Sequence, residues 1–127
     1  MLEQQHSFKF RGETVTVRFP NVGQLIDIES LKQLYTGGRY AIMAASNLKS
    51  MGYALDLVDS IVFFQVLCPK IKKVAGVDNL LNISTELGNE LIEVYKKEIY
   101  APWYSDVLKQ IYTYGSGEET KQVESEE

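Results

Sequence analysis

The chain has 127 residues, of which 45% are hydrophobic and 24% charged, and its formal net charge is −4. This length is that of one domain, and the composition argues against both a disordered chain and a membrane protein. Residues 1–114 carry 12 basic and 12 acidic groups, so the charge excess lies in residues 115–127, and the neutral body argues against nucleic-acid binding, which needs an excess of Lys and Arg on one face.

The first predicted element is a β-hairpin over residues 6–19. In FKFRGETVTVRFP, residues 8–20, apolar and polar side chains alternate around one glycine, as they do in strands. A type II′ turn with Gly12 and Glu13 at its centre predicts that Phe10 faces Val15. One face then carries Phe8, Phe10, Val15, Val17 and Phe19, and the other carries Lys9, Arg11, Thr14, Thr16 and Arg18. The apolar face must be covered, and the helix after Asn21 is the nearest candidate.

Helices are expected from residue 21 onward. Asn21 and Gln24 have the spacing of a capping box, and the helix that they start should end at the glycines of 36–38. A second helix is expected from Arg39 to about Met51, with Gly52 as its break.

The third helix is expected over residues 53–68. It is apolar nearly all round except at Asp56 and Asp59, which is typical of a helix at the centre of a bundle. Its length is below the ~20 residues needed to cross a bilayer, so no membrane is expected. Pro69 should end it, and a connection with a short helix near residues 77–81 should follow.

A longer helix should start at Ser84 or Thr85 and stop or kink at Pro102, because proline has no amide hydrogen. A final helix is expected over residues 103–113, and the acidic residues 115–127 are expected to be disordered. These elements predict an α+β fold, mostly α, in which an N-terminal hairpin packs on a bundle of four to six helices within a single domain of residues 1–114.

No catalytic, cofactor or metal motif is present in the sequence. His6 is the only histidine, which excludes a relay or metal site that needs two imidazoles from one chain. Cys68 ends an apolar helix and is interpreted as a buried structural thiol. Asp56 and Asp59 share one helix face, as paired carboxylates for acid-base work do, but a wet edge on an apolar helix is the preferred interpretation.

Two further stretches could bind ligands. TGGRY at 36–40 could hold an anion, although a turn between helices is favoured because the spacing matches no phosphate-binding loop. PKIKK at 69–73 could contact nucleic acid, although a solvated loop is favoured.

Glu93 and Lys97 are placed to form an i, i+4 ion pair.

Aromatic residues crowd near the C-terminus. Tyr95, Tyr100, Tyr104, Tyr112 and Tyr114 lie with Trp103 within twenty residues. Tyr and Trp are enriched in protein interfaces, because they bury a large area and keep a polar tip. A second interpretation is that Trp103 and some of the tyrosines cap the core at Pro102, and both interpretations stay open.

The opening FKFRGETVTVRFP, followed by LIDIESLKQL at 25–34, resembles the start of the small tail assembly chaperones of long-tailed bacteriophages. The resemblance covers the layout of residues 6–67 and includes no signature residue. It implies a cytoplasmic, non-catalytic protein that binds the extended tape measure protein and recruits tail tube subunits before assembly.

The predicted function is therefore non-catalytic protein binding in phage tail assembly, in the host cytoplasm. The partner would be a tape-measure-like protein or a tail tube subunit, and no cofactor, metal, nucleic acid or small-molecule substrate is expected. The residues proposed for partner contact are Phe8, Phe10, Arg18, Tyr100, Trp103 and Tyr104. The alternative is a structural component of the virion or of a ring, which self-associates through the edge of the hairpin.

Overall fold

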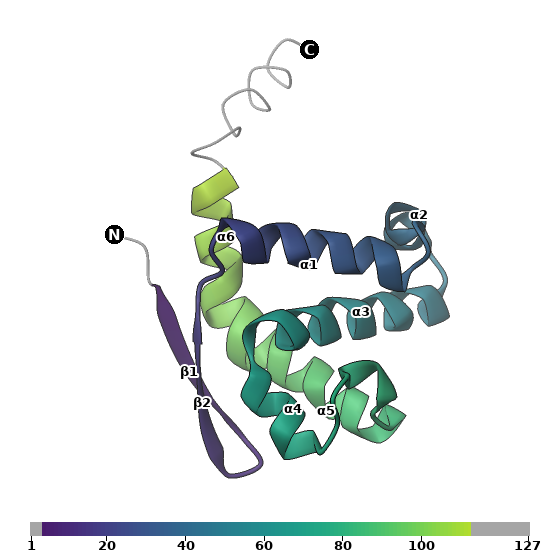
Figure 1. The fold of residues 1–127 in the computed structure, drawn as a ribbon. Helices are drawn as coiled ribbons and strands as arrows, with labels where there is room; N and C mark the ends of the chain where they lie inside the picture. The colour runs from purple at the N-terminus through teal and green to yellow at the C-terminus, as the bar shows by residue number, and fades with distance from the viewer. Residues whose placement is uncertain (1–3, 113–127) are drawn as a thin grey trace.

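A computed structural model of the chain describes residues 4–112. The elements are β1 (Gln5–Phe10), β2 (Glu13–Arg18), α1 (Val22–Tyr35), α2 (Tyr40–Ala45), α3 (Lys49–Leu67), α4 (Pro69–Ala75), the 3₁₀ turn η1 (Leu80–Asn82), α5 (Thr85–Val94), the π-helix η2 (Tyr95–Tyr104) and α6 (Ser105–Tyr112). The fold is α+β and mostly helical, with an N-terminal antiparallel hairpin beside packed helices, as the sequence predicts (Figure 1). The expected acidic tail, residues 115–127, lies outside the described residues.

The hairpin turn lies one residue earlier than expected. Arg11 and Gly12 have φ values of 51° and 82°, and positive φ at both central positions is the mark of a type I′ turn. Phe8 therefore pairs with Val15, and the predicted type II′ turn, which pairs Phe10 with Val15, is wrong. The predicted faces are correct, because the two registers differ by two residues and the side-chain period of a strand is two.

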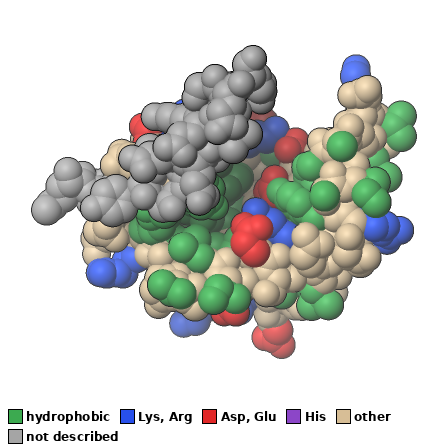
Figure 2. Space-filling model, turned by 90° about the horizontal axis from the view of Figure 1, so that it is seen from above, with side chains coloured by type: hydrophobic (Ala, Val, Ile, Leu, Met, Phe, Trp, Pro, Cys, Tyr) green, Lys and Arg blue, Asp and Glu red, His purple; other side chains and the backbone are tan. Residues whose placement is uncertain are grey.

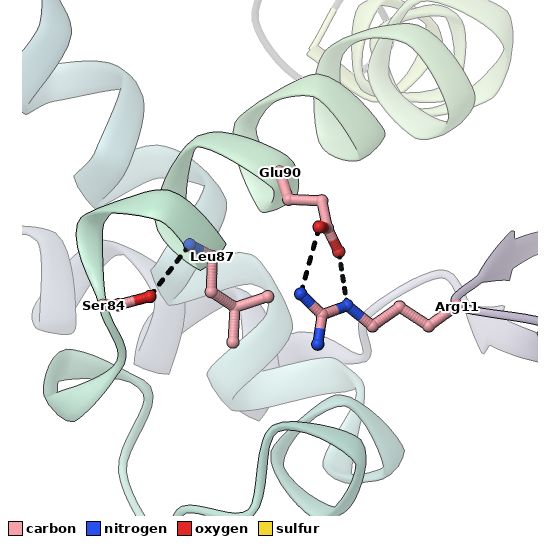
Figure 3. A network of polar contacts seen from close by, with 4 residues as sticks. All are labelled: Arg11, Ser84, Leu87 and Glu90. Atoms are coloured by element: carbon pink, nitrogen blue, oxygen red, sulfur yellow. Dashed lines mark hydrogen bonds and ion pairs between the residues drawn. The ribbon is translucent and has the colours of Figure 1, made fainter.

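The apolar face of the hairpin is covered by α3 and η2. Phe8 packs at a ring distance of 6.1 Å from Phe64 of α3, and Phe19 lies 6.1 Å from Trp103 and 5.5 Å from Tyr104, both in η2. The expected cover, α1, packs on α3 instead. At the hairpin tip, Arg11 forms a two-pronged ion pair with a glutamate of α5 (Figure 3).

Helix α1 begins and ends as predicted, but α2 does not. Asn21 Oδ1 accepts a hydrogen bond from the backbone N–H of Gln24, which completes the capping box. The expected helix over 39–51 is wrong, because α2 ends at Ala45 and the backbone N–H of Leu48 turns to Ser46 Oγ at 3.1 Å. A serine side chain that binds nearby backbone competes with helix continuation in this way. Gly52 consequently lies inside α3.

Helix α3 is the central helix and contacts α1, α2, α4 and α5. By length and composition it could cross a membrane, and here its residues 60–64 are buried among the other elements. Pro69 ends α3 as predicted. It also begins α4, where a connection was expected, since proline at the first position of a helix removes no hydrogen bond.

The helical path does not stop at Pro102. Residues 95–104 form the π-helix η2, which joins α5 to α6. In a π-helix each N–H bonds to the carbonyl five residues earlier, so the donor that Pro102 lacks would serve the carbonyl of Lys97. His6 Nε2 donates to the carbonyl of Glu98 at 2.5 Å, and its ring stacks on Trp103 at 5.2 Å. Strand β1 is thus tied to η2 by a hydrogen bond and a stacked ring.

Candidate functional site

Four of the six residues predicted to contact a partner lie in the core. The exposed fractions are 4% for Phe8, 2% for Phe10, 3% for Trp103 and 5% for Tyr104. They are buried because the hairpin turns its apolar face towards α3 and η2. Of the predicted set, Arg18 and Tyr100 remain on the surface.

Trp103, Tyr104 and Tyr95 pack in or against the core, as the second interpretation of their crowding predicts, whereas Tyr100 and Tyr112 are exposed and Tyr114 lies outside the described residues. Tyr104 packs edge-on to Phe63 at 4.9 Å, and Tyr95 lies 5.1 Å from the same ring. Tyr100 continues this aromatic stack outward, 5.8 Å from Tyr95, and ends it at the surface. The stack therefore forms both a core and one wall of a surface cavity.

That cavity, here called the tyrosine cavity, has a volume of about 420 Å³. It lies between α1, the start of α2, α3, η2 and α6, and Figure 2 shows the molecule hollowed on the face seen from above, with charged side chains beside apolar walls. The aromatic lining residues are Tyr40, Phe63, Tyr95, Tyr100, Tyr104 and Tyr112. The aliphatic and charged lining residues are Leu25, Ile28, Glu29, Lys32, Asp56, Asp59, Lys96 and Leu108.

Both lysines of the cavity are paired with a carboxylate. Lys32 Nζ lies 3.0 Å from Glu29 Oε2 and also sits 5.2 Å from the ring centroid of Tyr40. Lys96 Nζ lies 2.8 Å from Asp56 Oδ2. The ammonium groups are thus held at the edge of the cavity by groups of opposite charge.

The third carboxylate, Asp59, has a different environment. Its Oδ1 accepts a hydrogen bond of 2.5 Å from the Tyr40 hydroxyl, and no ion pair with it forms among the described residues. Burial raises the pKa of Asp59, while the Tyr40 hydrogen bond and the charge of Lys32 act against this rise. Burial also raises the pKa of Tyr40, so its hydroxyl remains a donor at neutral pH.

Residues considered for catalysis have structural roles. Cys68 is 2% exposed, and burial raises the pKa of its thiol to about 12, so the thiolate that a nucleophile needs is disfavoured. The prediction of a buried structural thiol is confirmed. Within residues 4–112, no group of three or more His, Cys, Asp and Glu side chains is arranged to hold a metal ion.

The other candidate stretches are structural as well. TGGRY forms the turn between α1 and α2, in which Arg39 Nε donates to the carbonyl of Thr36 at 3.0 Å. PKIKK forms most of α4, and Lys70 Nζ donates to the carbonyl of Thr14 in the hairpin at 3.1 Å. The predicted Glu93–Lys97 pair is present at 2.7 Å.

A set of exposed aliphatic residues was not anticipated from the sequence. We call it the α1–α2 apolar surface, and its members are Val22, Ile26 and Leu34 on α1, Ile42 on α2, Leu48 before α3 and Met51 in the first turn of α3. Val22, Ile26 and Leu34 lie on the side of α1 away from Ile28, its one buried residue, as the 100° per residue of a helix requires. Helix α2 buries none of its six residues. The sequence did contain a signal for this surface, since the predicted helix after Asn21 carries apolar residues on two sides and only one side can face the core.

Comparisons of the chain with models of protein families, with curated proteins and with solved structures find no match.

Proposed function

We propose that this chain is a non-catalytic protein-binding factor that holds an apolar segment of its partner against the α1–α2 apolar surface. The observation that supports this proposal is the concentration of large exposed aliphatic residues there, with Val22 74%, Leu34 70% and Ile42 68% exposed. Single exposed apolar residues are ordinary, but a concentration of them is typical of interaction sites. Figure 2 shows apolar side chains at the surface on the side where α2 lies.

The resemblance of residues 6–67 to phage tail assembly chaperones supports a specific partner. That resemblance implies an extended tape measure protein, which is bound before the tail tube is assembled. An aliphatic surface on α1 and α2 would cover apolar segments of such a protein, and the even balance of charge in residues 1–114 would not repel them. We place this activity in the host cytoplasm.

The test is co-expression with candidate tape-measure-like proteins, followed by size-exclusion chromatography with light scattering. The expected result is a complex that the combined variant Leu34→Asp and Ile42→Asp abolishes. The matched control is Gln33→Asp, an exposed position on α1 beside Leu34, which should leave the complex intact. A chain that stays at its monomer mass of 14.4 kDa with every candidate partner would contradict the proposal.

Self-association through the hairpin is a second candidate. The hairpin is a sheet of two strands only, so each strand has an outer edge with no strand neighbour among the described residues, and such edges can pair with another chain. A mass several times that of the chain in the absence of a partner, and the presence of the protein in purified particles, would favour this function over chaperoning.

A further inference from the structure

We propose that the tyrosine cavity binds an organic ammonium or guanidinium cation, held between tyrosine faces and the carboxylate of Asp59. This site lies apart from the α1–α2 apolar surface and does not depend on the function proposed for that surface. Its volume of about 420 Å³ is within the range of about 300–1,000 Å³ that is usual for small-ligand sites.

The walls have the chemistry that holds such cations. Five tyrosines and one phenylalanine line the cavity, and aromatic faces attract a cation within about 6 Å of the ring centroid. One face already does this within the molecule, since Lys32 Nζ lies 5.2 Å from the Tyr40 centroid. Burial raises the pKa of Tyr95 and Tyr104, so these rings stay neutral at physiological pH.

Among the described residues that line the cavity, negative charges outnumber positive charges by one. Three carboxylates and two ammonium groups line it, which leaves a net charge of −1 when all are ionised. The lysines pair with Glu29 and Asp56, so the unmatched charge is that of Asp59, which is half-buried. A half-buried carboxylate without a counter-ion costs free energy, and a bound cation would supply that counter-ion.

The same residues argue against other ligands. An anion would meet the unmatched charge of Asp59. A metal ion needs several oxygen, nitrogen or sulfur ligands converging on one point, and no group of three suitable side chains is so arranged within the described part of the chain. An organic cation needs one carboxylate and aromatic faces, and the cavity offers both.

The direct test is a titration of the folded protein with n-butylammonium chloride, followed by amide chemical shifts in NMR spectra. Saturable shifts at the lining residues are expected, with 1-butanol as the uncharged probe of the same shape binding at least about tenfold more weakly. Equal affinity for 1-butanol, or no saturable shift with butylammonium, would overturn the proposal.

Variants locate the charge within the cavity. Asp59→Asn keeps an oxygen that can accept from Tyr40 and removes the charge, so it should weaken butylammonium binding by about tenfold or more. The control Asp78→Asn removes the same charge at an exposed position outside the cavity and should leave the affinity unchanged. Tyr100→Leu removes an exposed aromatic face and should weaken binding about two- to fivefold. Equal affinities of the Asp59→Asn and Asp78→Asn proteins would overturn the proposal.

Two further probes distinguish the sources of the cation. An acetylated Ala-Lys-Ala amide and its norleucine counterpart carry the same side-chain shape with and without the charge. Binding of the lysine peptide alone assigns the site to a basic side chain of a protein, and binding of butylammonium without the peptide assigns it to a free amine; both outcomes support a cation site. The combined Leu34→Asp and Ile42→Asp variant should keep its affinity for butylammonium, so failure at one surface leaves the other proposal standing.

Discussion

The hairpin with η2 and the α1–α2 layer are both rich in apolar side chains, but the fold treats them differently. Phe8 and Trp103 are at most 4% exposed, because the hairpin, α3 and η2 pack together into one core around them. Ile26 and Ile42 are 60% and 68% exposed, because α1 has one buried residue and α2 has none.

The first group of apolar residues is buried on folding, whereas the second group stays exposed to solvent. Each aromatic side chain buries a large apolar area, so placing aromatic residues in a small core gives the largest gain in buried area per residue. Aliphatic side chains on a helix that is apolar on two sides can serve the core with one side only. In this chain the second side is where a partner has most apolar area to gain.

The first prediction sets the two regions against each other directly and has the largest expected effect. Trp103→Ala should lower the free energy of unfolding by about 3–5 kcal/mol, since it opens a cavity under the hairpin. Ile26→Ala should change it by no more than about 0.5 kcal/mol, as is usual for exposed positions. Urea denaturation followed by circular dichroism measures both values. Equal losses of unfolding free energy in the two variants would contradict the conclusion that only the first region forms the core.

The second prediction concerns the hydrogen bond that joins the hairpin to η2. His6→Ala should cost about 1–2 kcal/mol, because it removes both a bond to the Glu98 carbonyl and a stacked ring from Trp103. In a Pro102→Ala background the same change should cost as much, since the new N–H at position 102 of a π-helix faces the carbonyl of Lys97 and leaves the Glu98 carbonyl to His6. A double-mutant cycle with urea denaturation measures the coupling. A clearly smaller cost in the Pro102→Ala background would contradict this, because it would mean that the new N–H takes over the Glu98 carbonyl.

Much of the first region could be predicted from the sequence. Strict alternation identified the faces of the hairpin, and in the second region Asn21 with Gln24 identified the start of α1, because these signals are local. The turn register was wrong because Arg11 adopts a positive φ, a backbone conformation that a non-glycine residue seldom adopts. The predicted stop or kink at Pro102 missed the continuous path from α5 to α6, because a π-helix over residues 95–104 has no local sequence signal and proline normally interrupts a helix.

The cavity and the exposed surface were less accessible to prediction. The crowding of tyrosines was visible in the sequence, but the opposite walls of the cavity come from Ile28 and Asp59, in α1 and α3. Their placement depends on how the helices pack, which no local pattern states. The exposed side of α1 could have been recognised from Val22 and Ile26, which share a face four residues apart, but a core role was the simpler expectation.

The third prediction tests the carboxylate that lies between the two regions. The pKa of Asp59 in the folded protein lies above its ordinary value of 3.8, so the folded state binds this proton more tightly than the unfolded chain does. The contribution of Asp59 to the free energy of unfolding should therefore fall as pH rises from 3.8 through the folded-state pKa. Asp59→Asn should remove this loss.

The difference between the wild-type and Asp59→Asn unfolding curves isolates the effect of the Asp59 charge, including its repulsion with Asp56 and Glu29. Urea denaturation at a series of pH values from about 3 to 7 covers the ordinary carboxyl range. The variant should gain stability relative to the wild type as pH rises, and by less than the His6 variant loses. Parallel pH curves would mean that Asp59 is as well solvated in the folded protein as in the unfolded chain.

The smallest change in stability is expected at the tip of the hairpin, where Arg11 and Glu90 form an ion pair (Figure 3). Arg11 Nε lies 2.7 Å from Glu90 Oε1, with the two side chains 50% and 41% exposed. Pairs this exposed contribute little, because water and salt screen the charges. Glu90→Gln should shift the urea midpoint barely beyond repeat error, and not at all in about 1 M salt. Phe10→Ala, one residue before Arg11 on β1, should destabilise the protein strongly. A large, salt-sensitive loss in Glu90→Gln would mean that the hairpin is held by charge at its tip, whereas the burial of Phe8 and Phe10 indicates that it is held by its apolar face.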